Sequence, residues 1–233
     1  MTPAISLDKI QQQAPALVSM VKTAAVSLDK QGLTGQRAAV YLVLDHSGSM
    51  VPFYRAGDVQ HLAEQALGLS VNLDDDGSVP VFFFSARAES PFDVDLGNYQ
   101  GIIDREHAHT RWGSTNYEAA ITAVVSDYQA SGATDPALVI FQSDGEPDSR
   151  KDAEMALKAA SKLPLFWAFI GFGEWVEFLE KLDDLRGRAV DNASFYGCGN
   201  RPQAISDASL YDGITHEFAS WLTAARAKGI VTS

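Results

Sequence analysis

Nearly continuous apolar runs alternate with helical segments along most of this chain, and this alternation constrains the fold more than any other feature. The runs at 38–44, 79–85, 137–142 and 165–171 are rich in aliphatic and aromatic residues, as strands buried on both faces are. Helices are expected at 58–72, 117–129, 151–162 and 175–185, followed by a short strand at 193–196 and a last helix around 210–222. This order predicts an α/β fold with a Rossmann-like, doubly wound, mainly parallel sheet flanked by helices on both faces.

Two segments stand outside the alternation. Residues 1–36 indicate a helical extension before a domain at 37–233: Ser6 can cap a first helix, Pro15 should interrupt it, and a second helix from 15 to about 30 ends before Gly32. Apolar residues recur three and four apart through both helices, which favours packing against the chain's own domain over a coiled-coil or partner seam. The connection at 90–112 exceeds the usual loop length, so it is either functional or contains a short antiparallel strand.

Composition narrows the class of protein. A hydrophobic share of 46% suffices for a sizeable core and is too high for general disorder. The formal net charge of −12 argues against a nucleic-acid partner, and the single Cys198 excludes an internal disulfide framework and a cysteine-rich zinc site. The first ten residues hold no apolar run behind a basic segment, and no stretch is long and apolar enough to span a bilayer. We therefore expect a cytoplasmic protein without a signal peptide or membrane span.

The segment D-x-S-x-S directly follows the first apolar run. In an extended loop alternate residues point to the same side, so Asp45, Ser47 and Ser49 can aim their oxygens at one point, while Gly48 allows a tight turn. Hard oxygen donors of this kind suit Mg²⁺, Mn²⁺ or Ca²⁺ far better than zinc. The segment therefore predicts a metal site.

Two further segments add donors to this site. Thr115 lies just before a predicted helix, and Asp144 follows the apolar run at 137–142. Parallel sheets bind ligands beyond the carboxyl ends of their strands, where Asp45 and Asp144 both fall. The predicted metal ligands are thus Asp45, Ser47, Ser49, Thr115 and Asp144.

Taken in order, these three segments resemble the metal-ion-dependent adhesion site of the von Willebrand factor A (vWA) family, and the resemblance spans about residues 38 to 225. The segments S-D-G-E-P at 143–147 and L-D-D-D-G at 73–77, with P-V-F at 80–82, are most similar to the intracellular members, namely bacterial tellurite-resistance (Ter) and stress proteins and the copines. The resemblance implies a vWA fold and a divalent cation, Mg²⁺ before Mn²⁺ or Ca²⁺. It also implies an exchangeable coordination position that takes a carboxylate from a protein partner.

Simpler interpretations compete at several residues. The hydroxyl residues could merely cap helices while Asp45 closes a turn, although capping does not explain their common place at strand ends. His46 occupies a variable position of the motif and is expected to be exposed to solvent, because hard cations seldom take imidazole. Glu146 is either a supporting group or the start of the next helix, and Trp112 either forms a rim that reads a partner or is buried in the core. His107 has only His109 nearby in sequence, so zinc is not expected.

The segment N-x-D-x-D-G at 72–77 mimics the start of an EF-hand loop. The twelfth position, which needs a bidentate glutamate, is Phe83 in a predicted strand. We therefore interpret the segment as a turn.

The leading functional hypothesis is a cytoplasmic, metal-dependent protein-binding scaffold in a bacterial tellurite-resistance or stress response. One alternative is a metal-dependent phosphoesterase or phosphotransferase, for which the sequence lacks a phosphate clamp and a nucleotide-binding P-loop. A second alternative is a structural, oligomer-forming domain with a vestigial metal site. Enzyme activity is not expected, since the usual active-site set is incomplete.

Overall fold

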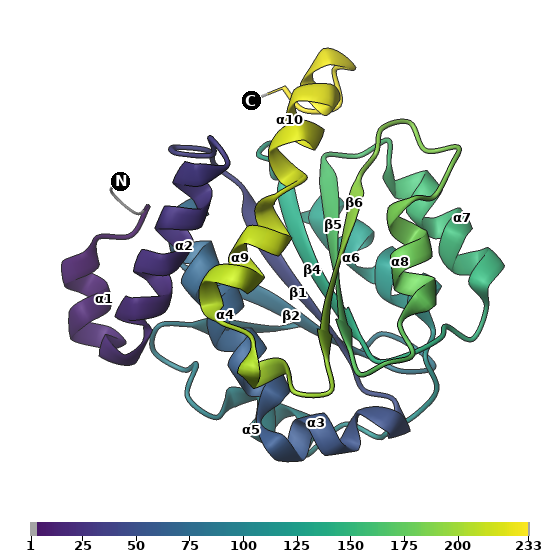
Figure 1. Ribbon diagram of the computed structural model, residues 1–233, viewed down its shortest axis with the longest axis horizontal. Helices are drawn as coiled ribbons and strands as arrows, with labels where there is room; N and C mark the ends of the chain where they lie inside the picture. Colours follow the sequence, from purple (N-terminus) through teal and green to yellow (C-terminus); the bar gives the residue numbers. More distant parts are fainter. Residues whose placement is uncertain (1–3, 233) are drawn as a thin grey trace.

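A six-stranded sheet lies between two layers of helices in the computed structural model, which describes residues 4–232 (Figure 1). The strands are β1 (Ala39–Asp45), β2 (Ser78–Phe84), β3 (Phe92–Asp95), β4 (Ala137–Ser143), β5 (Leu165–Phe172) and β6 (Ala193–Gly199). Their order is β3-β2-β1-β4-β5-β6; β3 pairs antiparallel with β2, and all other pairs are parallel. The predicted doubly wound α/β fold is confirmed.

The helices connect these strands in chain order. They are α1 (Leu7–Gln13), η1 (Pro15–Leu17), α2 (Val18–Lys30), η2 (Gly48–Met50), α3 (Val51–Ala56), α4 (Asp58–Leu73), α5 (Ile102–His107), α6 (Tyr117–Ser131), α7 (Arg150–Ala160), α8 (Glu177–Asp183), η3 (Pro202–Ala204), α9 (Asp207–Thr215) and α10 (Phe218–Ala227).

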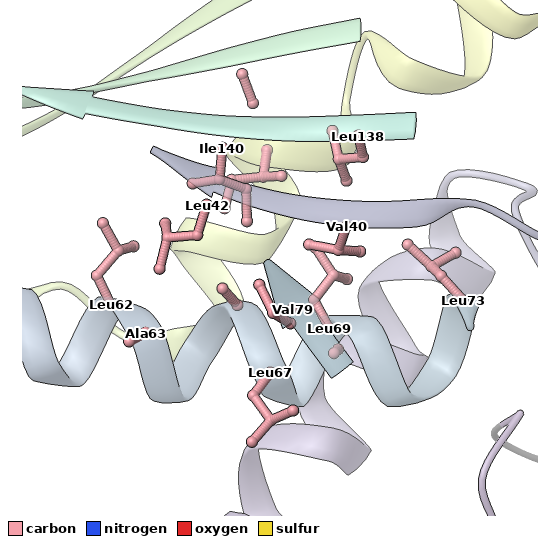
Figure 2. Close-up of a cluster of buried hydrophobic side chains, with 14 of the residues drawn as sticks. Val40, Leu42, Leu62, Ala63, Leu67, Leu69, Leu73, Val79, Leu138 and Ile140 are labelled. Carbon is pink, nitrogen blue, oxygen red and sulfur yellow. The ribbon is translucent and has the colours of Figure 1, made fainter. Parts of the chain in front are cut away.

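Side chains on successive strand positions enter two separate cores, one on each face of the sheet. On β1, Val40 and Leu42 belong to one buried cluster, whereas Tyr41 and Val43 belong to the other. The first cluster is covered by α4, α9 and the N-terminal helices, and the close-up shows aliphatic residues of β1, β4 and α4 meeting there (Figure 2). The second lies under α6, α7 and α8. Burial on both faces explains why the strand sequences are nearly all apolar.

The N-terminal helices pack on the domain as the sequence predicts. Ser6 caps α1 by accepting a hydrogen bond from the backbone N–H of Lys9, and Pro15 opens η1. The stripe residues Ile10, Leu17 and Val21 are buried in the first core, and α2 contacts both α4 and α9. The division at residues 36 and 37 stays a prediction, and residues 1–3 and 233, which it includes, lie outside the described part of the chain.

The long connection at 90–112 contains β3, which pairs antiparallel with β2. A short antiparallel strand was one of the two predicted explanations for the length of this connection. The connection also contains the short helix α5, and α3 follows the D-x-S-x-S segment; neither was predicted, because one or two turns of helix leave no clear periodicity. The single last helix that the apolar spacing predicts is instead two helices, α9 and α10, separated at 216–217. Among the described residues, no helix is both long and apolar enough to cross a membrane.

Candidate metal centre

Asp45 is held at the end of β1 by the pairing of β1 with β4. Leu44 pairs with Gln142 in this parallel register, so Asp45 and Ser143 come next on the same face of the sheet. The Ser143 hydroxyl donates a hydrogen bond to Oδ2 of Asp45, and the backbone N–H of Ser47 donates to Oδ1 at 2.8 Å. The hydroxyl of Tyr54 donates to the backbone carbonyl of Asp45 at 3.1 Å. The carboxylate is therefore oriented by its neighbours and fully buried.

A chain of hydrogen bonds joins the two serines of the motif to the second aspartate. The hydroxyl oxygens of Ser47 and Ser49 lie 3.1 Å apart, and the Ser49 hydroxyl donates to Oδ1 of Asp144 at 2.8 Å. These residues come from the ends of β1 and β4, which are neighbours in the sheet. The structure thus brings four of the five predicted ligands together: Asp45, Ser47, Ser49 and Asp144.

Thr115, the fifth predicted ligand, lies in a loop that runs beside the D-x-S-x-S segment. Gly113 forms a parallel bridge with Ser47, in which Gly48 N–H donates to the Gly113 carbonyl at 3.2 Å. A Cβ on Gly113 would lie 2.9 Å from Ser85, just after β2, so glycine allows this loop to pass close to Ser85. Thr115 follows two residues later and is half-buried, and no hydrogen bond of its hydroxyl ties it to the other four residues in the described structure.

Asp148 connects the threonine loop to the loop that follows Asp144, and sequence patterns alone did not single this residue out. Its carboxylate accepts hydrogen bonds from the Ser114 hydroxyl at 2.7 Å and from the Thr115 N–H at 3.1 Å. Its own N–H donates to the Thr115 carbonyl at 2.8 Å. An aspartate just before a predicted helix is usually interpreted as its N-cap, but Ser149, and not Asp148, caps α7 in the structure. These hydrogen bonds reach a loop that is distant in sequence and that only folding brings near.

Burial raises the pKa of both aspartates in the metal-free protein. Loss of solvation, with a smaller contribution from the charge of Asp144, raises the pKa of Asp45 to about 7, against hydrogen bonds from Ser143 and Ser47 that lower it. Burial likewise raises the pKa of Asp144, and the hydrogen bond from Ser49 lowers it. Among residues 4–232, no lysine, arginine or histidine forms an ion pair with either carboxylate. A bound cation would supply the missing positive charge.

The oxygen donors of the candidate centre fit a divalent cation. Carboxylates and hydroxyls are oxygen ligands of the kind that Mg²⁺ and Ca²⁺ prefer. Within the described part of the chain, no three histidine, cysteine, aspartate or glutamate side chains gather in a group that could hold a metal ion. Gly48 and Ser49 are exposed, so the candidate centre opens to solvent.

The expectation that His46 is exposed is wrong. Its side chain is fully buried and stacks on Trp112, with ring centroids 3.8 Å apart and planes within 4°. Burial lowers the pKa of His46 to about 4, so the ring is neutral at pH 7. Trp112 itself is 38% exposed, which places it at the surface and not in the core. Glu146 is exposed and accepts a hydrogen bond at 2.6 Å from Arg150, the first residue of α7, so it contacts the start of the next helix.

The segment at 72–77 is a turn, as predicted. Asn72 is the penultimate residue of α4 and its amide donates to the carbonyls of Val21 and Gly68. Gly77 has a φ of 67°, and Phe83 lies within β2. These positions leave no EF-hand loop.

The fold, with hydroxyl and carboxylate loops at the carboxyl ends of parallel strands, is that of a von Willebrand factor A domain. A family model described as the vWA domain found in the TerF C terminus matches residues 37–231. The chain belongs to this vWA-TerF-like family. It is also 34% identical over 216 residues to the uncharacterised protein YcbR of Bacillus subtilis (strain 168), covering 90% of this chain and 88% of that protein.

Solved structures support the fold at low sequence identity. The SpRpn10 VWA domain is similar with a TM-score of 0.54 and 14% identity, over 75% of this chain and 93% of that one. The von Willebrand factor type A protein of Catenulispora acidiphila gives a TM-score of 0.52 and 15% identity, over 79% of this chain and 42% of that one. The proximal thread matrix protein 1 of the mussel byssus gives 0.58 and 15%, and the match spans 47% of that chain and 77% of this one. Domains of this family act in general as protein-interaction and adhesion modules without enzymatic activity.

Proposed function

We propose that this chain is a cytoplasmic adaptor that binds a protein partner through a divalent cation, and that the partner supplies an acidic side chain to that cation. The ion is Mg²⁺ in preference to Mn²⁺ or Ca²⁺. Its ligands are Asp45, Ser47, Ser49, Thr115 and Asp144, some of them acting through water.

The observation that carries this proposal is the uncompensated pair of carboxylates within a set of hydroxyl groups. Asp45 is buried without a positive partner in the described structure, and Ser49 links Ser47 to Asp144. Hydroxyl ligands are neutral, so the two aspartates only balance the charge of a divalent ion. No excess of negative charge is then left to repel a third carboxylate. The exposed position of Ser49 leaves an approach for it.

The family match supports a biological setting for this proposal. The matching model describes the vWA domain of TerF, and this supports a role in a bacterial tellurite-resistance or stress response. The general character of vWA domains as non-enzymatic interaction modules supports a scaffold over an enzyme. The solved vWA structures are similar to this chain in fold only, so their partners do not identify the partner of this chain.

Calorimetry tests the metal part directly. Metal-stripped protein is titrated with Mg²⁺, Mn²⁺ and Ca²⁺ beside Asp144→Ala, with Glu146→Ala as the control because Glu146 is an exposed carboxylate two residues away. We expect saturable one-to-one binding that Asp144→Ala abolishes and Glu146→Ala preserves. Equal binding by all three proteins would refute the site.

Affinity capture in Mg²⁺ and in EDTA tests the adaptor part with the same variants. A partner retained only in Mg²⁺, and lost with Asp144→Ala, supports the proposal. Hydrolysis of p-nitrophenyl phosphate that requires Asp144 would instead favour the metal-dependent phosphoesterase.

A further inference from the structure

A cleft of about 440 Å³ opens beside the candidate metal centre. Its walls come from α3, from α5 and from the loop that carries Trp112, and Figure 1 shows α3 and α5 together at the carboxyl end of the sheet. This volume falls within the ~300–1,000 Å³ typical of ligand clefts. None of the five predicted metal ligands lines this cleft.

The cleft is joined to the metal centre by direct contacts. Tyr54 lines it, and the hydroxyl of the same residue donates to the backbone of Asp45. Trp112 also lines it and directly precedes Gly113, which pairs with Ser47. A partner segment that places one side chain at the metal centre can therefore place a neighbouring side chain in the cleft.

Trp112 is a rigid aromatic platform in this cleft. His46 covers one face of its indole in a parallel stack, while Tyr54 stands edge-on at 5.1 Å and 86°. The ring of His107 completes the group, 5.0 Å from Tyr54 and 5.8 Å from Trp112. Trp112 is nevertheless 38% exposed. A fixed and partly exposed tryptophan beside a cleft is the kind of residue that becomes a binding hot spot.

The charges around the cleft balance one another. Arg55 and Asp104 both line it, and Asp104 lies 3.7 Å from the ring nitrogen of His107. Val51 and Ala56 add uncharged side chains to the lining. A charged side chain would disturb the balance between Arg55 and Asp104, whereas an uncharged aromatic ring can stack on the exposed part of the Trp112 indole.

We propose that this cleft receives an aromatic side chain of the protein partner, next to the acidic residue that reaches the candidate metal centre. The inference rests on the proposed function, since it names the chemistry of the same partner. It predicts a recognition segment in which an acidic and an aromatic residue lie close together.

Peptide display on the full chain tests this inference. A library of short random peptides with one fixed aspartate is selected in Mg²⁺ against the wild-type protein, Trp112→Ala and Asp144→Ala. We expect aromatic residues near the aspartate among peptides from the wild type, and no such enrichment with Trp112→Ala. Enrichment of aliphatic or basic residues, of none, or of aromatic residues regardless of Trp112 would overturn the inference.

The same selection separates the inference from the proposed function. Peptides that need aspartate, Mg²⁺ and Asp144 but show no aromatic preference would sustain the metal-dependent function and refute the cleft. Peptides that need an aromatic residue and Trp112 but are indifferent to EDTA would sustain the cleft and refute the metal-dependent function. A selection that yields no binding peptide would count against both.

Affinities of a selected peptide provide the quantitative check. We expect Trp112→Ala to weaken its binding about tenfold, which corresponds to about 1.4 kcal/mol. Trp175→Ala is the matched control, because Trp175 is 73% exposed and is not among the residues that line the cleft. Ala56→Gln, which adds bulk to the wall without disturbing the stack on His46, should weaken binding in the same way. Equal losses in the Trp112 and Trp175 variants, or full affinity in Ala56→Gln, would refute the placement.

Discussion

The ionised carboxylate of Asp45 destabilises the metal-free protein, and Asp45→Asn should relieve this cost. Burial raises the pKa of Asp45 from 3.8 to about 7 in the folded state, whereas the unfolded chain keeps the ordinary value. Between these two values the folded state holds a proton that the unfolded state has lost, so the free energy of unfolding falls as pH rises from about 4 to 7. The contribution of protonated Asp45 to the free energy of unfolding is therefore fully present near pH 4 and is lost above pH 7.

The magnitude follows from the difference of about three between the two pKa values. At about 1.4 kcal/mol for each pKa unit, ionisation of this one group costs ~4 kcal/mol above pH 7. Asparagine keeps an oxygen that can accept from Ser47, and the Ser143 hydroxyl can turn to accept from the new amide. We therefore expect Asp45→Asn to be more stable than the wild type at pH 8 and nearly equal to it at pH 4.

Urea unfolding in EDTA at pH 4, 6 and 8 measures this difference. Mg²⁺ gives a second readout at pH 8, because a ligand present at a hundredfold excess over its Kd stabilises the folded state by about 2.7 kcal/mol. The wild type should gain this stability and Asp45→Asn should not. An Asp45→Asn protein that is less stable than the wild type at pH 8 in EDTA would refute the reasoning.

Three further substitutions test how the rest of the structure supports the site. Asp148→Ala should weaken metal binding about fivefold in calorimetry, which corresponds to ~1 kcal/mol for the loss of partly exposed hydrogen bonds to the threonine loop. Asp152→Ala, which changes an exposed aspartate in the first turn of α7, should leave metal binding unchanged. Equal effects of the two substitutions would contradict the role of Asp148. Leu17→Ala should lower the free energy of urea unfolding by about 2–5 kcal/mol, because Leu17 is buried in the first core. Val26→Ala, at a residue 65% exposed, should change it by less than about 0.5 kcal/mol. Gly213→Ala should lower the free energy of urea unfolding by about 1–3 kcal/mol, because the added Cβ would overlap the ring of Tyr196 in β6. An unchanged unfolding midpoint would contradict this close packing of α9 on β6.

The sequence by itself determined the class of fold and most of the residues that gather at the candidate metal centre. Strands buried on both faces must be apolar throughout, so the runs around Leu42 and Ile140 could be recognised without knowing their neighbours. Asp45, Ser47 and Ser49 are close in sequence, and their spacing fixes their side of the loop. Asp144 could be added because the ends of parallel strands meet at one edge of the sheet.

Tertiary structure decided the features that depend on distant segments. Asp148 reaches the Thr115 loop across 33 residues, and its local sequence resembles a helix cap. His46 is polar and sits in a surface motif, yet Trp112 covers it from a loop that no periodicity placed. The cleft beside Trp112 likewise forms only where α3, α5 and that loop come together. Local patterns set which faces are apolar, but packing between segments far apart in the chain decides which polar groups are buried and which rings remain exposed.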